Sequence, residues 1–521
     1  MDPAAVHAIE ERRQEQQTRL DSLKTASERN KWGQFATPPG LALSIARYAH
    51  ALMGNTPIRF LDPAIGTGSF YSALSQAFPP QKIAAAVGVE IDPIFAKTAA
   101  TLWGKIGLNV VKGDFTEQRP PEQRFNLVLT NPPYVRHHHL SSDVKKRLKA
   151  YLGQSLHLDI SGLAGLYCYF LLLCHNWMED DGLAVWLIPS EFMDVNYGVT
   201  LRHYFTERVT LLHIHRFCPT DVQFTDALVS SAVVVFRKSP PPPGHAARFS
   251  FAGPIEHPEN ESLVSLDMLR RSRKWTHFPA RTTVENTGEL NLGDIFAIKR
   301  GLATGSNSFF LLTETDIENW QIPRPFLKPI LPGPRHLTQD VIESLPSGAP
   351  DVSPRLYLLD CNEPEERIKT TWPRFYEYLQ QGRQQNIHET YLASRRTPWY
   401  SQEQRPPAPF LCTYMGRSRN GKQPFRFIWN RSQATAHNVY LMLYPKGRLR
   451  GTLKDHPELE VHVFEALKRI TPAQLISEGR VYGGGLHKVE PKELAHISAR
   501  LVLDSIATHV RIEHQVPMLF T

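Results

Sequence analysis

At 521 residues the chain is too long for one ordinary hydrophobic core, so we expect two or three folded units and exclude a single small domain. Hydrophobic residues make up 41%, charged residues 21% and aromatic residues 10% of the sequence, a composition that excludes a disordered scaffold. The formal net charge of +8 is a mild basic excess, larger after residue 240 than before it, which fits a nucleic-acid partner without proving one.

The spacing of the cysteines and the length of the apolar stretches indicate whether the chain binds a metal and in which cellular compartment it lies. None of the five cysteines pairs with another at metal-ligand spacing, and no disulfide framework is indicated, so we expect a reducing compartment and no zinc site. Residues 1–31 lack the apolar core of a secretory signal. The longest apolar stretch, 163–174, is shorter than the about 20 residues that cross a bilayer, and we interpret it as a buried helix. These features predict a cytoplasmic protein.

The first half of the chain has the pattern of an α/β sheet. Residues 1–30 are rich in Glu, Arg and Gln, and we expect a solvated N-terminal helical arm. Short apolar runs then alternate with helical patterns at 59–61, 85–90, 109–111, 125–130, 182–189, 210–217 and 227–236. Seven such runs predict a doubly wound, seven-stranded Rossmann-like sheet of mainly parallel strands. No long helix separates the last two runs, which predicts an antiparallel hairpin at one edge.

A proline run marks the expected domain boundary. Pro240 to Pro243 are followed by Gly244, and such a run forms neither helix nor central strand, so we place an interdomain linker at 240–245. The predicted domains are therefore the arm at 1–30, a catalytic domain at 31–239 and a C-terminal domain at 246–521. In the last we expect strands at 308–312 and 356–359 and helices at 458–469 and 491–503, and hence a mixed α/β domain.

A glycine-rich turn follows the first predicted strand. Gly66 and Gly68 would let the backbone approach a ligand closely, and Ala64 lies in the same turn. Asp62, which ends the strand, can accept a hydrogen bond from that ligand. Since many α/β proteins use such a turn only to join a strand to a helix, the turn alone leaves the ligand open.

Acidic residues also end the next two strands. Glu90 lies 22 residues after Gly68, the spacing at which an acidic side chain binds ribose hydroxyls, and Ile91 could pack on an adenine face. Asp114 could accept from the amino group of a cofactor's adenine, and Phe115 could cover its ring. The third glycine of a dinucleotide turn and the Gly-Lys-Ser/Thr of a phosphate loop are both absent from the segment. Three carboxylates at successive strand ends thus favour a nucleoside-containing cofactor other than NAD or ATP.

The segment Asn131-Pro132-Pro133-Tyr134 follows the hydrophobic strand 125–130, at the sheet edge where ligands of open α/β folds bind. An aromatic amino nitrogen is a poor nucleophile because its lone pair is delocalised. The side-chain oxygen of Asn131 and the carbonyl of Pro132 could accept its N–H bonds and aim the lone pair at a sulfonium methyl, while the prolines keep that carbonyl rigid. Tyr134 could stack on a planar base. The pattern predicts methyl transfer to an amino group.

With these motifs the chain resembles the adenine-specific DNA methyltransferases of the gamma arrangement, and in particular the type II modification methylases. The segment Gly33-Gln34-Phe35-Ala36-Thr37-Pro38, the glycine turn, the acidic strand ends and the Asn-Pro-Pro-Tyr motif come in the family order. The resemblance implies S-adenosylmethionine as cofactor, no metal, and Thr37 and Pro38 near its methionine part. It also implies a flipped-out adenine in duplex DNA, with Phe224 stacking opposite Tyr134.

The C-terminal domain resembles the family's target-recognition domain through the segments 301–307, 395–400 and 479–486. Basic side chains in and near these segments could contact phosphates and base edges. The candidates are Arg395, Arg396, Arg417, Arg419, Lys422 and Arg480. The expected partners are double-stranded DNA and a cognate restriction endonuclease, and a monomer would suffice.

Other interpretations of the motif stay open. It would also serve methylation of the cytosine amino group, although those enzymes usually carry Ser in place of Asn131, and methylation of a protein glutamine amide, although those enzymes lack a large C-terminal region. His137, His138 and His139 lack acidic or cysteine partners at ligand spacing, so we interpret them as a loop near the flipped base rather than as a metal site.

Overall fold

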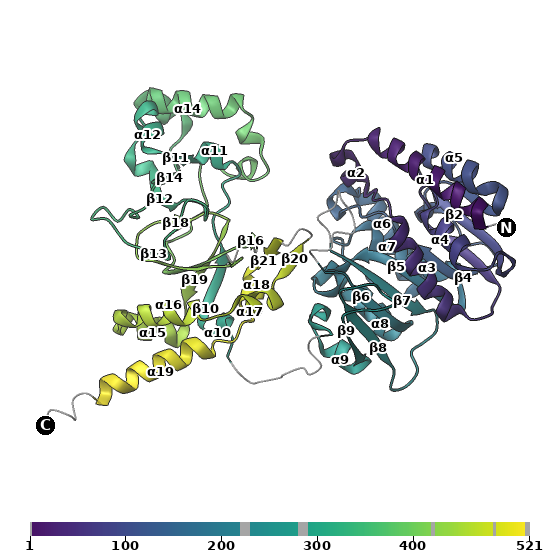
Figure 1. Ribbon diagram of the computed structural model, residues 1–521. Helices are drawn as coiled ribbons and strands as arrows, with labels where there is room; N and C mark the ends of the chain where they lie inside the picture. Colours follow the sequence, from purple (N-terminus) through teal and green to yellow (C-terminus); the bar gives the residue numbers. More distant parts are fainter. Residues whose placement is uncertain (1–2, 219–229, 280–289, 418–422, 483–485, 516–521) are drawn as a thin grey trace. The chain divides into compact units, whose positions relative to one another are not determined.

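The computed structural model describes residues 3–218, 230–279, 290–417, 423–482 and 486–515. The chain divides into two compact units, with the division after residue 286. Among the described helices none combines the length and the hydropathy that a membrane span needs. Each unit has a core of its own, and the two are described separately (Figure 1).

The first unit is built on a nine-stranded sheet in the order β3-β2-β1-β4-β5-β7-β6-β8-β9. Its strands are β1 (Ile58–Asp62), β2 (Ile83–Glu90), β3 (Leu108–Lys112), β4 (Phe125–Thr130), β5 (Met178–Pro189), β6 (Thr210–Arg216), β7 (Ser231–Arg237), β8 (Ala246–Phe251) and β9 (Asn260–Ser265). The strands β3, β2, β1, β4 and β5 run parallel to one another, and β7 pairs antiparallel with both β5 and β6. The seven strands predicted from the apolar runs are therefore present, and the predicted antiparallel hairpin is formed by β6 and β7.

Helices cover both faces of this sheet, as expected for a doubly wound fold. They are α1 (Pro3–Ser22), α2 (Ala26–Trp32), α3 (Pro39–Met53), α4 (Ser69–Ala77), α5 (Pro93–Trp103), α6 (Ser142–Leu156), α7 (Leu166–Cys174), α8 (Val199–Glu207) and α9 (Leu266–Arg271). The buried side chains of β5 alternate between two cores: Trp186 packs with residues of α6 to α9, and Val185 with residues of α3 to α5. Because strand side chains point alternately to opposite faces, a continuous apolar run is what a two-sided sheet requires.

The proline run is not the domain boundary that we predicted. Directly after it, β8 pairs in parallel with β6, and β9 pairs antiparallel with β8, so the sheet continues through residue 265. The β6–β7 hairpin consequently does not form the edge of the sheet. A proline run ends a strand, but it leaves the following segment free to return to the same sheet, because pairing is decided by which edge is available.

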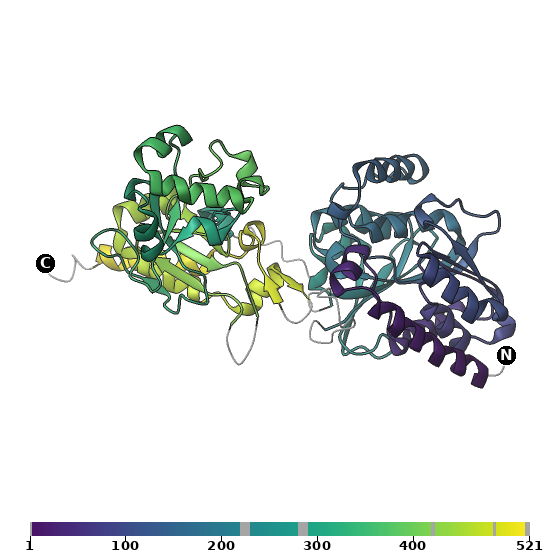
Figure 2. The same cartoon turned by 90° about the horizontal axis from the view of Figure 1, so that it is seen from above.

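The N-terminal arm also differs from the prediction of a solvated helix. Helix α1 lies along the surface of the first unit, as Figures 1 and 2 show in purple. Arg13 and Glu10 are both buried and form an ion pair, with Arg13 Nη2 2.7 Å from Glu10 Oε1. Arg13 also donates to Thr67 Oγ1 (3.1 Å), and Thr67 donates to Gln17 Oε1 (2.7 Å). One polar face of α1 is thus bound to the glycine-rich turn.

The second unit is a mixed α/β structure with three small sheets, in the orders β10-β19-β15-β17-β13, β11-β14-β12-β18 and β16-β21-β20. Its strands are β10 (Phe296–Arg300), β11 (Leu311–Leu312), β12 (Leu327–Leu331), β13 (Val341–Ile342), β14 (Leu356–Leu359), β15 (Phe410–Thr413), β16 (Met415–Arg417), β17 (Phe427–Asn430), β18 (Thr435–Ala436), β19 (Tyr440–Pro445), β20 (Arg480–Tyr482) and β21 (Leu486–Lys488). Its helices are α10 (Leu292–Ile295), α11 (Asn307–Phe310), α12 (Glu314–Trp320), α13 (Glu365–Thr371), α14 (Pro373–Gln384), α15 (Gly447–Asp455), α16 (Glu460–Lys468), α17 (Pro472–Glu478), α18 (Pro491–Leu494) and α19 (Arg500–Gln515).

Two local predictions for this unit were wrong. The run 308–312, predicted as a strand, is mostly the short helix α11, and only its last two residues form β11. The run 491–503, predicted as one helix, begins as α18, breaks after Leu494 and resumes as α19. The backbone of the break is used for pairing, because Leu292 N donates to the Ile497 carbonyl and Gly293 N to the Ala495 carbonyl. Tertiary pairing thus replaces local helix propensity.

Candidate active site

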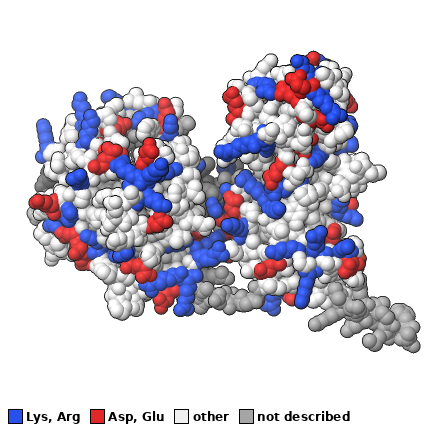
Figure 3. Space-filling view, turned by 180° about the vertical axis from the view of Figure 1, so that it is seen from behind, with Lys and Arg blue, Asp and Glu red and all other residues white. Residues whose placement is uncertain are grey.

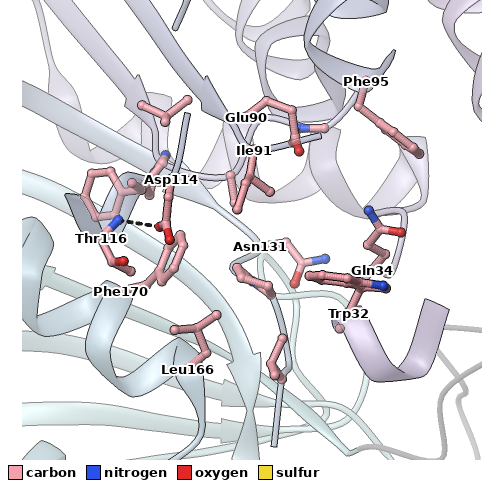
Figure 4. A pocket seen from close by; sticks show the side chains of 18 of the residues that line it. Trp32, Gln34, Glu90, Ile91, Phe95, Asp114, Thr116, Asn131, Leu166 and Phe170 are labelled. Atoms are coloured by element: carbon pink, nitrogen blue, oxygen red, sulfur yellow. Dashed lines mark hydrogen bonds between the residues drawn. The ribbon is translucent and has the colours of Figure 1, made fainter. Parts of the chain in front are cut away.

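A cavity of about 450 Å³ opens at the carboxyl ends of the parallel strands of the first unit. Its walls include the turns that follow β1, β2, β3 and β4, represented by Gly66, Glu90, Asp114 and Asn131 (Figure 4). Ligand sites in proteins usually measure about 300–1,000 Å³, so this cavity is large enough for a small organic molecule. Parallel strands bring the four turns together because all of them leave the sheet at the same edge.

Asp62 lies behind this wall rather than in it. Its Oδ1 accepts from Thr130 Oγ1 (2.6 Å) and from the amide of Ala64 (3.0 Å), and its side chain is fully buried. Burial raises the pKa of Asp62 to about 7, although both hydrogen bonds act in the opposite direction, and the nearby Glu90 carboxylate raises it further. Asp62 therefore fixes the glycine-rich turn to β4.

The buried carboxyl of Asp62 predicts a dependence of stability on pH. Burial raises the pKa of Asp62 in the folded state, so the protonated carboxyl contributes to the free energy of unfolding. This contribution is fully present below the ordinary pKa of 3.8 and is lost as the pH rises through about 7. Asp62→Asn, which is never charged, is expected to raise the melting temperature of the ligand-free protein more at pH 8 than at pH 5. Asp143→Asn, which alters an exposed carboxylate, is the control. An equal gain from Asp62→Asn at both pH values would contradict this account.

Glu90 and Asp114 line the cavity as predicted. Glu90 accepts the amide of Gly66 on Oε2 (2.9 Å) and that of Asp92 on Oε1 (2.8 Å), and burial raises its pKa. Asp114 Oδ1 accepts from the amide of Thr116 (2.8 Å), as the dashed line in Figure 4 marks. Both carboxylates are held by the backbone, and their remaining lone pairs are open to a ligand.

Apolar side chains also line the cavity beside Glu90 and Asp114. Ile91 lines it with 58% of its surface exposed, and Phe115 lines it from a buried position. The ring of Phe115 lies 5.2 Å from that of Phe170, a second lining aromatic on α7. The sequence did not indicate Phe170, because a lining residue looks the same as a core residue in the all-apolar run 163–174.

Asn131 is oriented by its amide nitrogen. Its Nδ2 donates to the carbonyl of Phe35 (2.9 Å) and lies 3.1 Å from Thr37 Oγ1. A carbonyl only accepts hydrogen bonds, so this contact fixes which end of the amide is nitrogen. The opposite atom, Oδ1, is buried and has no hydrogen-bond partner within the described protein. A buried polar atom without a hydrogen-bond partner destabilises a folded protein, so this oxygen is a candidate acceptor for a hydrogen bond from a bound ligand.

The remainder of the Asn-Pro-Pro-Tyr motif divides between cavity and core. Pro133 lines the cavity, whereas Pro132 is buried. The ring of Tyr134 is also buried: it packs at a centroid distance of 5.6 Å from Phe35, and its hydroxyl donates to the Leu187 carbonyl (3.0 Å). Tyr134 is thus not among the cavity-lining residues, and the stacking role predicted for it stays a prediction.

Thr37 and Pro38, which precede the first strand, support the site indirectly. Thr37 contacts Asn131, and its carbonyl accepts from Ser69 Oγ (3.0 Å), while Pro38 caps the start of α3. Neither lines the cavity, and neither does Gly68, whose backbone lies against Trp103. Ala64, by contrast, is a lining residue.

The two N-terminal helices contribute lining residues that the sequence did not indicate. Gln17 and Asp21 come from α1, Trp32 ends α2, and Gln34 follows it. In a polar helix such as α1, nothing in the sequence separates a cavity-lining Gln from a solvated one. Tertiary contacts place this helix over the site, among them the hydrogen bonds of Arg13 and Gln17 with Thr67 in the glycine-rich turn.

The segment that begins with His137, His138 and His139 reaches the cavity. His139, Leu140 and Ser141 line it, which agrees with a loop near the site. Among the described residues no group of three His, Cys, Asp or Glu side chains could hold a metal ion. Phe224, the second predicted stacking residue, lies outside the described residues.

The six basic residues predicted to bind DNA fall into three groups. Arg396 donates to the carbonyls of Ala303 and Thr304 (both 2.8 Å), and Arg480 Nε donates to Glu493 Oε1 (2.7 Å), so both hold the protein's own backbone or side chains. Arg395, which stacks on the ring of Tyr391, and Arg417 are exposed. Arg419 and Lys422 lie outside the described residues. Basic and acidic side chains are interspersed on the face of each unit seen in Figure 3.

Comparison with known proteins gives matches over most of the chain. A family model described as Eco57I restriction-modification methylase matches residues 92–223, and one described as the C-terminal domain of type II methyltransferase M.Eco57I matches residues 277–516. The chain is 27% identical over 483 residues to type II methyltransferase M.XamI of Xanthomonas campestris pv. amaranthicola, covering 89% of this chain and 84% of that protein. It is 25% identical over 500 residues to M.AccI of Acinetobacter calcoaceticus, covering 89% and 85%.

A solved structure is similar in fold. The type IIL restriction-modification enzyme MmeI, solved in complex with DNA, superposes with a TM-score of 0.56 at 12% identity, covering 93% of this chain and 69% of MmeI. At this identity the likeness concerns the fold alone.

Proposed function

The chain belongs to the type II restriction-modification methylases and is a DNA methyltransferase, and we propose that it methylates the exocyclic 6-amino group of adenine with S-adenosylmethionine as donor. The observation that carries the proposal is the buried, unpartnered Oδ1 of Asn131 beside the cavity. An exocyclic amino group offers the hydrogen that this oxygen lacks.

Asn131 prepares the amino nitrogen for attack. When Oδ1 accepts one N–H of the target, the nitrogen loses conjugation with the ring and its lone pair becomes directional. The carbonyl of Pro132 is our candidate acceptor for the second N–H. Since the amide of Asn131 is already held by Phe35 and Thr37, little reorganisation accompanies the reaction, and preorganised dipoles of this kind commonly supply the largest part of the rate.

The cavity has the chemistry to hold the donor. The carboxylate of Glu90 suits ribose hydroxyls, and Asp114 suits the amino group of an adenine ring that Ile91, Phe115 and Phe170 would enclose. The cofactor, when bound, supplies an electrophilic methyl group on a sulfonium centre. The residues of the chain bind it, exclude water and align its methyl with the nitrogen at Asn131, as a positioned displacement requires.

The second unit is our candidate for target recognition. It corresponds to the segment matched by the family's C-terminal domain, and the exposed Arg395 and Arg417 are the described candidates for phosphate or base contacts. Because a duplex hides the target nitrogen, we infer that adenine is flipped out of the helix, with Tyr134 and Phe224 as the proposed stacking residues. We further propose that the enzyme acts as a monomer alongside a cognate restriction endonuclease.

The test is transfer of a labelled methyl group from S-adenosylmethionine to plasmid DNA, followed by digestion to nucleosides and chromatography. We expect the label in N6-methyl-2′-deoxyadenosine. Label in N4-methylcytosine would replace the target base and keep the amino-group mechanism, whereas label in 5-methylcytosine would contradict that mechanism. Label that enters added protein, but never DNA, would refute the DNA substrate.

A further inference from the structure

An indole lies in the wall of the cavity with most of its surface open. Trp32 lines the cavity, and its side chain is 59% exposed. Aromatic side chains bury a large area when they can, so an exposed indole in the wall of a concave site is a contact surface for a ligand.

The backbone around Trp32 is firmly held. Gly33 has φ 63°, closes α2 as its C-cap, and accepts the amide of Tyr134 on its carbonyl (3.2 Å). A Cβ at Gly33 would fall 2.4 Å from the nitrogen of Tyr134, so this close approach requires glycine. Trp32 is therefore bound through its neighbour to the Asn-Pro-Pro-Tyr loop.

A second set of contacts holds the backbone that follows Trp32. Lys24 Nζ donates to Asp92 Oδ2 (2.8 Å) and to Gln34 Oε1 (3.0 Å), which ties the segment after Trp32 to the turn between β2 and α5. The indole thus projects from a fixed frame, and a ligand that meets it need not order the backbone first.

The cavity has two chemically different ends. In the view of Figure 4, Trp32, Gln34 and Asn131 lie toward one side of the cavity and Asp114, Thr116 and Phe170 toward the other. The hydrogen bond from Asn131 Nδ2 to the carbonyl of Phe35 holds the segment of Trp32 and Gln34 close to Asn131. Under the proposed function, on which this inference rests, the adenosine part of the cofactor takes the Asp114 end and its methyl group must face Asn131. The sulfonium centre that carries the methyl consequently lies at the end where Trp32 projects.

We propose that the indole of Trp32 covers the sulfonium centre of the cofactor and binds its positive charge through the aromatic face. Tryptophan is the best partner for such cation–π contacts, and they strengthen when the pair is shielded from water. The thioether product, S-adenosylhomocysteine, carries no charge at sulfur. Trp32 therefore makes the enzyme discriminate between donor and product, which favours release of the product after transfer.

The test compares affinities for the two cofactor forms. Dissociation constants for S-adenosylmethionine and S-adenosylhomocysteine are measured by calorimetry for the full-length wild type, Trp32→Leu and Trp32→Phe. Leucine keeps apolar area and removes the aromatic face, whereas phenylalanine keeps a face. We expect the preference for the sulfonium form to fall roughly tenfold in Trp32→Leu and much less in Trp32→Phe. Leu23→Ala, which removes an exposed apolar side chain outside the cavity wall, should leave the preference unchanged.

The outcomes separate this inference from the proposed function. If the wild type binds both forms and Trp32→Leu keeps the wild-type preference, the inference is overturned and the proposed function stands. A Trp32→Leu protein that keeps this preference but binds DNA more weakly would assign the indole to the nucleic acid instead, which also overturns it. If the wild type binds neither form, the proposed function fails, and the inference fails with it.

Discussion

Replacement of Asn131 by alanine is expected to lower the rate of methyl transfer about 100- to 1,000-fold, the loss typical when one preorganised polar group of an active site is removed. The variant removes the buried Oδ1 that has no partner within the described protein, which is the proposed acceptor for the target N–H. The measurement is single-turnover transfer of labelled methyl to DNA with cofactor and DNA both saturating.

Two further variants sharpen this experiment. Asn131→Gln keeps the amide but moves it by one methylene, and it should lose nearly as much activity, because misplacement by about 1 Å can cost about 100-fold. Asn55→Ala removes an exposed asparagine outside the cavity wall and should act like the wild type. Wild-type turnover by Asn131→Ala would show that this oxygen does not activate the substrate.

Replacement of Arg13 by alanine is expected to destabilise the docked N-terminal helix by about 3–5 kcal/mol, because it leaves the carboxylate of Glu10 buried without its partner. The same change removes the donor to Thr67 in the glycine-rich turn. Since α1 carries Gln17 and Asp21 into the cavity wall, cofactor affinity should fall together with stability. Amide hydrogen exchange over residues 3–22 measures the loss of protection directly.

The neighbouring residue provides the matched control. Arg12 is exposed on the same helix, and Arg12→Ala should leave the exchange rates unchanged. The double variant Glu10→Met, Arg13→Met should recover much of the stability, because apolar side chains of similar size often replace a buried ion pair without loss. If Arg13→Ala exchanges like Arg12→Ala, the buried pair does not hold the helix in place.

The seven strands β1 to β7 of the first unit could be predicted because each is decided locally, whereas β8 and β9 were not predicted. A run such as 125–130 is mostly apolar, and at this length the pattern is typical of a strand buried on both faces. The domain boundary could not be predicted in the same way. Pro240 to Pro243 end β7 as expected, but the return of β8 to the free edge beside β6 depends on a partner that no local pattern names.

The site was predicted in part for a similar reason. The position of residues at or just after strand ends, such as Glu90 and Asn131, can be predicted from the sequence, because the carboxyl ends of parallel strands lie at the same edge of the sheet. For Arg396 and Arg480 contact with DNA stays a prediction, and the sequence did not indicate that both donate within their own unit, since a guanidinium looks the same in the sequence whether it faces DNA or a carbonyl or carboxylate.

The sequence by itself determined seven of the nine strands of the first sheet and the order of the motifs, because these depend on short-range patterns and on which residue types end which strands. Only the tertiary structure decided how Asn131 is oriented, that Tyr134 is buried, and that α1 and Trp32 join the cavity wall. These features arise from contacts between segments far apart in the chain. Arg13 with Thr67 and Gly33 with Tyr134 are such contacts, and their energies depend on distances that no local pattern encodes.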